Sequence, residues 1–267
     1  MSKPQLALTS CGLLTPNSMN FTILHYDSLD STNSEAVKQA KLGADEGLCV
    51  IAGQQTAGRG RHGRTWVSEP NSGLYFSVVL RPKVEPRFLP LITLMTGIAV
   101  YDALKLFGLK PDIKWVNDIL IGEKKICGIL AETVETPSGL AVVVGIGVNL
   151  TSKNFPAEIA ETATSIEAET GSRISADHFA RALTYYLSSI YRSLPFADGH
   201  QTIMRHWRRR SSYFRGKRVR VTLDSDTFTG TTDGLEENGA LRVKTADGSV
   251  KIVQAGDVER LRRVRSV

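Results

Sequence analysis

Cysteine is scarce in this chain of 267 residues, and the three cysteines show no paired spacing. Cys11, Cys49 and Cys127 form no Cys-x-x-Cys motif, which excludes a disulfide framework and a metal knuckle. Free thiols of this kind are typical of proteins kept in a reducing compartment. The cysteine pattern therefore predicts a cytoplasmic protein.

Long hydrophobic runs are also missing. The most apolar stretch, residues 88–101, contains a proline and two threonines and is shorter than the roughly 18 residues that a membrane helix needs. The N-terminus has one lysine and no apolar segment behind it, so we expect no secretory signal. Hydrophobic residues make up 42% of the chain and charged residues 22%, which excludes collagen-like and disordered proteins. We predict a globular protein without a membrane span.

Basic charge is concentrated in one segment. The net charge is +6, but residues 205–220 hold eight Arg and Lys residues and no acid, and the rest of the chain carries −2. Trp207, Tyr213 and Phe214 alternate with these arginines, as in a nucleic-acid stacking surface, so a nucleic-acid-binding protein is one hypothesis. The other is a basic helix at a domain junction. We favour the junction because the charge is local.

Apolar periodicity predicts an α+β protein with two domains. Before Phe214, strands and helices mix, whereas short strands with Asn-Gly and Asp-Gly hairpin turns follow it, as in a small β-barrel. We place the domains at 1–214 and 215–267, and we expect the first 20 residues to be irregular. Predicted strands span 22–26, 48–52, 74–80, 113–120, 126–134, 140–149, 219–223, 227–232, 240–245 and 250–253, and predicted helices span 35–41, 89–107, 176–194 and 197–212.

A glycine-rich loop lies between the predicted strands 48–52 and 74–80. Residues 58–63 match Gly-x-Gly-x-x-Gly, but no helix follows them, so a dinucleotide-binding turn is excluded. A kinase loop and a P-loop are excluded too, because their partner motifs and lysine are absent. Arg59, Arg61 and Arg64 crowd this loop and predict either a solvated loop or one that orders around a phosphate or carboxylate.

Two further segments carry charges in apolar surroundings. Asp118 ends a predicted strand, where a carboxylate could hold a Mg²⁺ ion bound to a nucleotide. Lys125 begins another predicted strand. Its ammonium either reaches the surface or points at a reacting carboxylate or phosphate.

Together these segments resemble the biotin protein ligases. The loop 54–66 resembles the adenylate-forming loop of that family, and it is the most specific of the matches. Val116 stands where the family usually has proline, a departure that affects strand geometry more than chemistry. The other matches, in family order, are Ser-Thr-Asn at 31–33, Lys-Trp-x-Asn-Asp at 114–118, Lys-x-x-Gly-Ile-Leu-x-Glu at 125–132 and Gly-Ile-Gly-x-Asn at 145–149.

The resemblance implies a set of site residues. Arg61 and Lys125 would be catalytic, and Asp118 would help to hold Mg²⁺. Trp66 packs either on the adenine or in the core, and Asn149 either binds the ribose–phosphate region or caps a turn. The biotin-binding set would be Ser31, Thr32, Asn33, Gln55, Arg59, Gly60, Arg61 and Lys125, and the ATP- and adenylate-binding set Arg59, Arg61, Arg64, Trp66, Lys114, Asn117 and Asn149.

The resemblance also implies a reaction and a fold. Biotin and ATP, with Mg²⁺, would give biotinyl-5′-AMP, and a lysine of a biotin carboxyl carrier protein would then take the biotin. The fold would be a class II synthetase-like mixed sheet with flanking helices and a C-terminal SH3-like barrel. The first core strand begins near Thr22, which leaves no room for the helix-turn-helix of repressor-type members, so we expect a monofunctional enzyme without sequence-specific DNA binding.

Two points stay open at the level of sequence. The lipoate and octanoate transfer branch of the same superfamily is the nearer alternative, although the arginine-rich loop and the C-terminal barrel favour the biotin branch. Members of the family often form dimers, so a homodimer is a candidate state of this chain.

Overall fold

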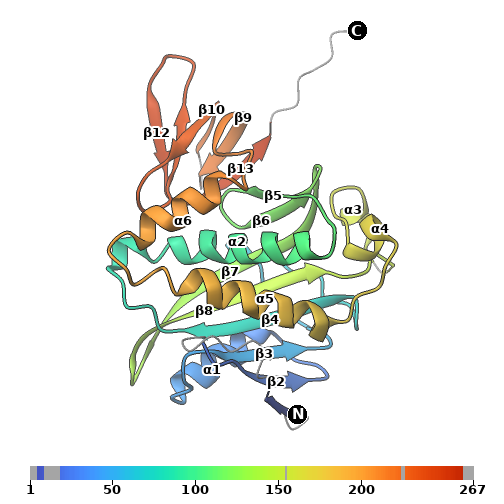
Figure 1. Ribbon diagram of the computed structural model, residues 1–267. Coiled ribbons are helices and arrows are strands. Elements are labelled where there is room, and N and C mark those ends of the chain that lie inside the picture. The colour runs from blue at the N-terminus through green and yellow to red at the C-terminus, as the bar shows by residue number, and fades with distance from the viewer. Residues whose placement is uncertain (1–4, 9–18, 154, 224–225, 261–267) are drawn as a thin grey trace.

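The computed structural model describes residues 5–8, 19–153, 155–223 and 226–260. Within these ranges, one mixed sheet of eight strands runs in the order β1-β2-β3-β4-β8-β7-β6-β5 (Figure 1). Strands β2 and β3 pair in parallel and all other neighbours pair antiparallel. The strands are β1 Gln5–Leu8, β2 Thr22–Tyr26, β3 Leu48–Ala52, β4 Gly73–Leu80, β5 Pro111–Lys114, β6 Asp118–Ile121, β7 Lys124–Thr136 and β8 Gly139–Asn149.

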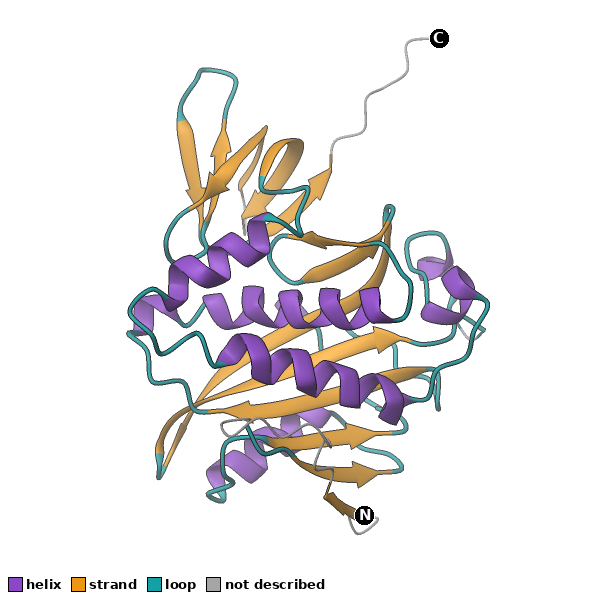
Figure 2. Ribbon diagram, viewed as in Figure 1, coloured by secondary structure: helices purple, strands orange, loops and turns teal. Residues whose placement is uncertain are grey.

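Helices cover the two faces of this sheet unequally. The apolar helices α2 and α5 lie side by side across one face, and α6 packs against α2 (Figure 2). Helix α1 lies on the other face, against β3, β4, β7 and β8. The helices are α1 Thr32–Lys41, α2 Leu91–Leu106, α3 Ala157–Ala160, α4 Ile166–Thr170, α5 Ala176–Tyr191 and α6 Gly199–Arg208, with short 3₁₀ turns η1 Arg61–Gly63 and η2 Pro86–Phe88.

The segment after α6 forms a second, antiparallel sheet in the order β12-β11-β10-β9-β13. Its inner residues, such as Val219 and Val243, are fully buried and belong to the same hydrophobic cluster as α2. The indole N–H of Trp115 donates to the carbonyl of Gly239 at 2.9 Å and fixes this sheet to the β5–β6 turn. The strands are β9 Arg215–Leu223, β10 Asp226–Leu235, β11 Leu241–Lys244, β12 Val250–Val253 and β13 Asp257–Arg260.

Most predicted elements are confirmed, but three predictions from the sequence are wrong. The single strand expected at 113–120 is a hairpin, because residues 115–117 form a turn between β5 and β6. Residues 5–8 form strand β1 in place of irregular chain, and Cys11 lies outside the described residues. The prediction that no stretch is long and apolar enough for a membrane helix is also wrong: Pro86–Leu106 contains an 18-residue window with a mean hydropathy of 1.4, although 61% of that window is buried inside the protein.

The basic stretch 205–220 forms the end of α6, a turn and the start of β9. Trp207 and Tyr213 are 0% and 3% exposed, so neither ring is free to stack on a base. Arg210 donates to both carboxylate oxygens of Asp102 at 2.9 Å, which ties the stretch to α2. These contacts agree with the junction hypothesis, and they bury two of the three aromatic side chains on which the nucleic-acid hypothesis depended.

Candidate active site

A cavity of about 170 Å³ opens over the face of the main sheet that carries α1. Its walls come from the first turn of α1, from the loop between β3 and β4, from the β5–β6 turn, and from β7 and β8. Residues 256–259 of the second sheet close one side. Residues far apart in the sequence therefore meet in one place, and we call residues 58–66 of this cavity the arginine loop.

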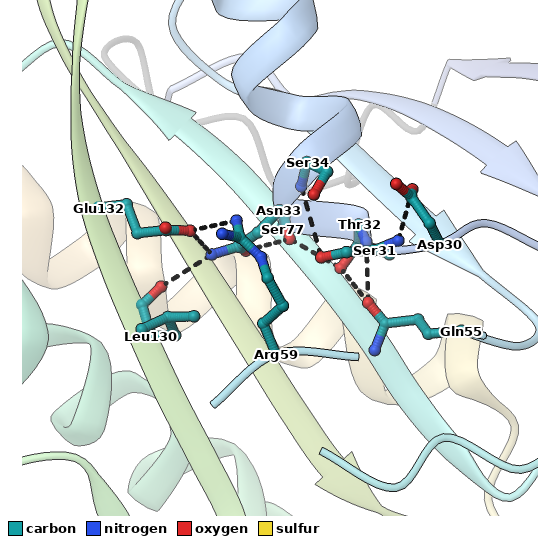
Figure 3. Close-up of polar contacts among 10 residues, drawn as sticks. All are labelled: Asp30, Ser31, Thr32, Asn33, Ser34, Gln55, Arg59, Ser77, Leu130 and Glu132. Carbon is teal, nitrogen blue, oxygen red and sulfur yellow. Dashed lines mark hydrogen bonds and ion pairs between the residues drawn. The ribbon is translucent and has the colours of Figure 1, made fainter. Parts of the chain in front are cut away.

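The sheet makes room for the first turn of α1 at one glycine. Ser77 of β4 pairs with Gly145 of β8, and Gly145 pairs with Leu130 of β7, so the three form a row across the sheet. A Cβ atom on Gly145 would overlap the side-chain amide of Asn33. The hydroxyl of Ser77 instead donates to Asn33 Oδ1 at 2.6 Å, which holds the amide in the space that the glycine leaves (Figure 3).

A second row of small residues receives the ring of Trp66. Gly147 of β8 pairs with Gly128 of β7. A Cβ atom on Gly147 would overlap the indole, and one on Gly128 would lie 2.8 Å from it. The indole Nε1 is buried and has no hydrogen-bond partner among the described residues. The glycines of the two strand motifs are therefore required by close packing against Trp66 and Asn33.

Polar groups line one end of the cavity. Ser31 is the N-cap of α1, and its hydroxyl accepts from the backbone N–H of Ser34. Gln55 Oε1 accepts from the backbone N–H of Thr32 at 2.8 Å (Figure 3). Gln55 Nε2 donates to the hydroxyl of Ser68 at 2.8 Å. This fixed set of donors and acceptors suits a neutral polar ligand.

The arginine loop is held by its own backbone. Arg59 and Thr65 form an isolated antiparallel bridge, and the N–H of Trp66 donates to the carbonyl of Gly58 at 2.9 Å. A Cβ atom at Gly58 would overlap the carbonyl of Trp66, so the loop can fold back only because this residue is glycine. Its three arginines consequently project from a short hairpin into and around the cavity.

Two of these arginines contact the β5–β6 turn or the second sheet. Arg61 Nη1 donates to Asn117 Oδ1 at 3.1 Å, and Arg61 Nη2 donates to the carbonyl of Gly256 at 3.3 Å. Arg64 forms an ion pair with Asp257. Burial lowers the pKa of the Arg61 guanidinium from its usual value, although Asp257 acts in the opposite direction. An arginine stays protonated under such conditions, so the loop brings fixed positive charge into a partly dry site.

A lysine and an aspartate face each other on the opposite wall. Lys125 Nζ lies 2.7 Å from Asp118 Oδ1 and 5.3 Å from the centre of the Trp66 ring, and Lys114 Nζ lies 3.6 Å from Asp118 Oδ2. Asp118 begins β6 and does not end a strand as predicted. No cluster of three or more His, Cys, Asp or Glu side chains that could hold a metal occurs in the described residues. In a nucleotide site, Mg²⁺ needs one or two carboxylates beside phosphate oxygens, and Asp118 would be the carboxylate for such an ion, although it already pairs with both lysines.

The cavity brings together every site residue predicted from the sequence except Asn149. The Asn149 side chain donates to the carbonyls of Lys125 and Thr164 at 3.4 and 3.0 Å, so it fixes a turn behind β8. Three residues that contact the site were not predicted from the sequence: Ser77, Glu132 and Asp257. The strand alternation of 73–80 could have placed Ser77 on the cavity side, whereas no local signal connects Asp257 with a loop almost 200 residues earlier.

Comparisons with known proteins assign the chain to a class of enzymes. Residues 26–149 match the biotin/lipoate A/B protein ligase family, and residues 214–261 match the biotin protein ligase C-terminal domain. A solved structure of the Aquifex aeolicus biotin protein ligase, in complex with biotin and ATP, superposes with a TM-score of 0.77 at 28% identity. The matched region covers 90% of this chain and 98% of the Aquifex aeolicus chain.

Curated relatives narrow the class. The biotin–[acetyl-CoA-carboxylase] ligase of Paracoccus denitrificans is 32% identical over 236 residues, which are 86% of this chain and 96% of the relative. The bifunctional ligase/repressor BirA of Bacillus subtilis is 34% identical over 243 residues, which are 89% of this chain and 73% of the relative. The chain therefore belongs to the biotin protein ligase family.

Proposed function

We propose that this protein is an ATP-dependent ligase that activates biotin as biotinyl-5′-AMP and transfers it to a lysine of a biotin carboxyl carrier protein. The observation that carries the proposal is a cavity lined both by the polar residues 31–33 and by Arg61 and Lys125. A neutral bicyclic ring fits the polar end, and an anion fits the basic end. Biotin and the ATP phosphates have this distribution of charge.

The chain's own residues account for the first step. A carboxylate oxygen of biotin attacks the α-phosphorus of ATP, the bond to the β-phosphate breaks, and pyrophosphate leaves. Two anions must approach each other, so fixed positive charge lowers the barrier. We assign this task to Arg59, Arg61 and Lys125, because all three lie along the cavity. Arg64 and Lys114 would contact the phosphates, and Trp66 the adenine.

The second step requires the same loop to protect the intermediate. The amine of the carrier lysine attacks the acyl carbon of the mixed anhydride, and AMP leaves with the electron pair of the broken bond. Water would compete for this anhydride, so the arginine loop must cover it. Arg61 suits a cover, because it already bridges to Asn117 and to Gly256 across the opening.

We also propose that Mg²⁺ takes part in the first step, bound to ATP. Mg²⁺ in nucleotide sites usually binds phosphate oxygens with one or two carboxylates, and it would neutralise phosphate charge here. Asp118 would provide the carboxylate. Because Asp118 already pairs with Lys125, we expect the ion to depend mainly on the phosphates of ATP.

The domain boundaries, the barrel, the location and the oligomeric state of the protein are further predictions. We divide the chain into a catalytic domain, 1–214, and a C-terminal domain, 215–267. The irregular register of β10 against both of its neighbours supports an SH3-like barrel. The free thiols of Cys49 and Cys127 agree with a cytoplasmic location. A homodimer, and the lack of sequence-specific DNA binding, rest on the resemblance alone.

Biotin-dependent exchange of pyrophosphate into ATP tests the main proposal. We expect exchange with biotin and none with lipoate, because the polar end offers hydrogen-bond donors and acceptors to a ureido ring. Intact mass of a carrier domain after incubation with biotin, ATP and Mg²⁺ then measures transfer. Exchange with lipoate and not with biotin would instead assign the chain to the lipoate branch.

A further inference from the structure

Glu132 lies beside the cavity and contacts two residues that line it, Asn33 and Arg59. It belongs to β7, in the register position opposite Val143, two residues beyond Leu130 on the same side of the strand. Its side chain is 30% exposed, so it is neither a core residue nor a freely solvated one. Glu132 is the last residue of the motif at 125–132, and the resemblance to the family implies no role for it.

One oxygen of this carboxylate accepts two hydrogen bonds. Glu132 Oε2 lies 2.7 Å from Asn33 Nδ2 and 2.7 Å from Arg59 Nη2 (Figure 3). The first donor belongs to α1 and the polar end of the cavity. The second belongs to the arginine loop. A single atom therefore joins the group that would hold the biotin ring to a group that would meet its carboxylate.

The two partners differ in how firmly they are held. The Asn33 amide also contacts the carbonyl of Leu130 at 3.3 Å and accepts from Ser77 at 2.6 Å, so it is fixed on all sides. The Arg59 side chain is 42% exposed, and Glu132 is its one hydrogen-bond partner among the described residues. Glu132 therefore fixes the guanidinium of Arg59, because the carboxylate oxygen that accepts from Arg59 also accepts from the firmly held amide of Asn33.

We propose that Glu132 is a positioning residue for biotin activation, which holds Arg59 in place along the cavity through the carboxylate oxygen that Arg59 shares with Asn33. The inference rests on the proposed function, since it explains how one arginine of a loop is ready for the substrate carboxylate. A side chain that is placed in advance loses less conformational entropy when it binds. Without Glu132, Arg59 would have to be ordered by biotin itself.

This arrangement predicts a specific kinetic pattern. Glu132→Ala raises the KM for biotin in pyrophosphate exchange by about 10- to 100-fold, the range expected for a charge-assisted hydrogen bond. The kcat changes less, because Arg61 and Lys125 stay in place. Glu132→Gln keeps an acceptor oxygen in the same position and recovers part of the loss. Glu135→Ala, an exposed glutamate on the same strand, is the matched control and leaves both constants unchanged.

A double-mutant cycle with Arg59→Ala separates positioning from general stability. If Glu132 acts through Arg59, Glu132→Ala adds little to the KM of the Arg59→Ala protein. Full additivity of the two effects, or a Glu132→Ala protein that matches Glu135→Ala, overturns the inference.

Limited trypsin digestion gives a readout that needs no biotin. Trypsin cleaves after arginine, and we expect Glu132→Ala to speed cleavage within the arginine loop relative to wild type and to Glu135→Ala, with Glu132→Gln between them. If the wild-type protein shows no biotin-dependent exchange, the proposed function is wrong. The digestion remains a test of the positioning role of Glu132, because it does not depend on biotin. Equal cleavage rates in all four proteins overturn the positioning role whatever the substrate is.

Discussion

Arg64 and Asp257 form an ion pair that joins the arginine loop to the first residue of β13. Together with the contact from Arg61 to the carbonyl of Gly256, it makes the second sheet part of the cavity wall. The order of the loop should therefore depend on the C-terminal sheet. The side chain of Arg64 is 66% exposed, so solvent screens the pair and its share of the free energy is small.

Asp257→Asn should loosen the arginine loop without unfolding the protein. An exposed pair is worth up to about 1 kcal/mol, so we expect amide hydrogens of residues 58–66 to exchange about two- to fivefold faster. Hydrogen-exchange mass spectrometry of the free protein measures this. Asp226→Asn, an exposed aspartate in the same sheet, is the control. Equal exchange in the two variants would mean that Asp257 does not hold the loop.

Arg61→Gly should release the adenylate before transfer. The substitution removes both the contact with Asn117 and the contact with Gly256, so the loop no longer bridges the opening. We expect biotin to appear on lysines of a bystander protein mixed with the carrier, at the expense of the carrier. Mass spectrometry of the mixture measures the ratio. Arg87→Ala, at an exposed arginine outside the cavity, serves as control, and firm retention of the adenylate by Arg61→Gly contradicts the covering role.

Lys125→Ala should slow activation more than it weakens biotin binding. Lys125 is the cation of the β7 wall and lies close to the ring of Trp66. Loss of a group that stabilises developing charge typically lowers the rate by about 10²- to 10³-fold. Single-turnover formation of the adenylate measures the effect, and Lys124→Ala, the exposed neighbour, is the control. An unchanged rate would remove Lys125 from the catalytic set.

Much of this site follows from local sequence. Three features can be predicted from neighbouring residues alone. They are the helix cap at Ser31, the close packing at the glycines of β7 and β8, and the concentration of positive charge in the arginine loop. Their meeting does not follow locally. The hairpin at 111–121 reads as one strand because its turn, residues 115–117, contains a buried tryptophan and a valine and no glycine.

Long-range partners are beyond such reasoning. Glu132 and Asp257 look like ordinary surface acids in the sequence, and only the register of β7 and the packing of the second sheet bring them to Arg59 and Arg64. The sequence likewise suggests that Asp118 is free for a metal. In the fold it lies between two lysines, because the β5–β6 turn and the start of β7 face each other.

Gly147→Ala should disable the site while the fold persists. The backbone of Gly147 is ordinary strand, so alanine causes no backbone strain, but its methyl group would overlap the indole of Trp66. Overpacking of this kind destabilises by about 1–3 kcal/mol, and the easier response is for Trp66, in a loop, to move out of the cavity. We expect exchange activity to fall at least about tenfold with a cooperative thermal transition retained. Gly97→Ala, where a methyl group meets Ile113 at an ordinary 3.5 Å, is the control. Trp66→Phe in the Gly147→Ala background relieves the overlap and should restore part of the lost stability. If Gly147→Ala behaves like Gly97→Ala in both assays, the indole does not rest on β8.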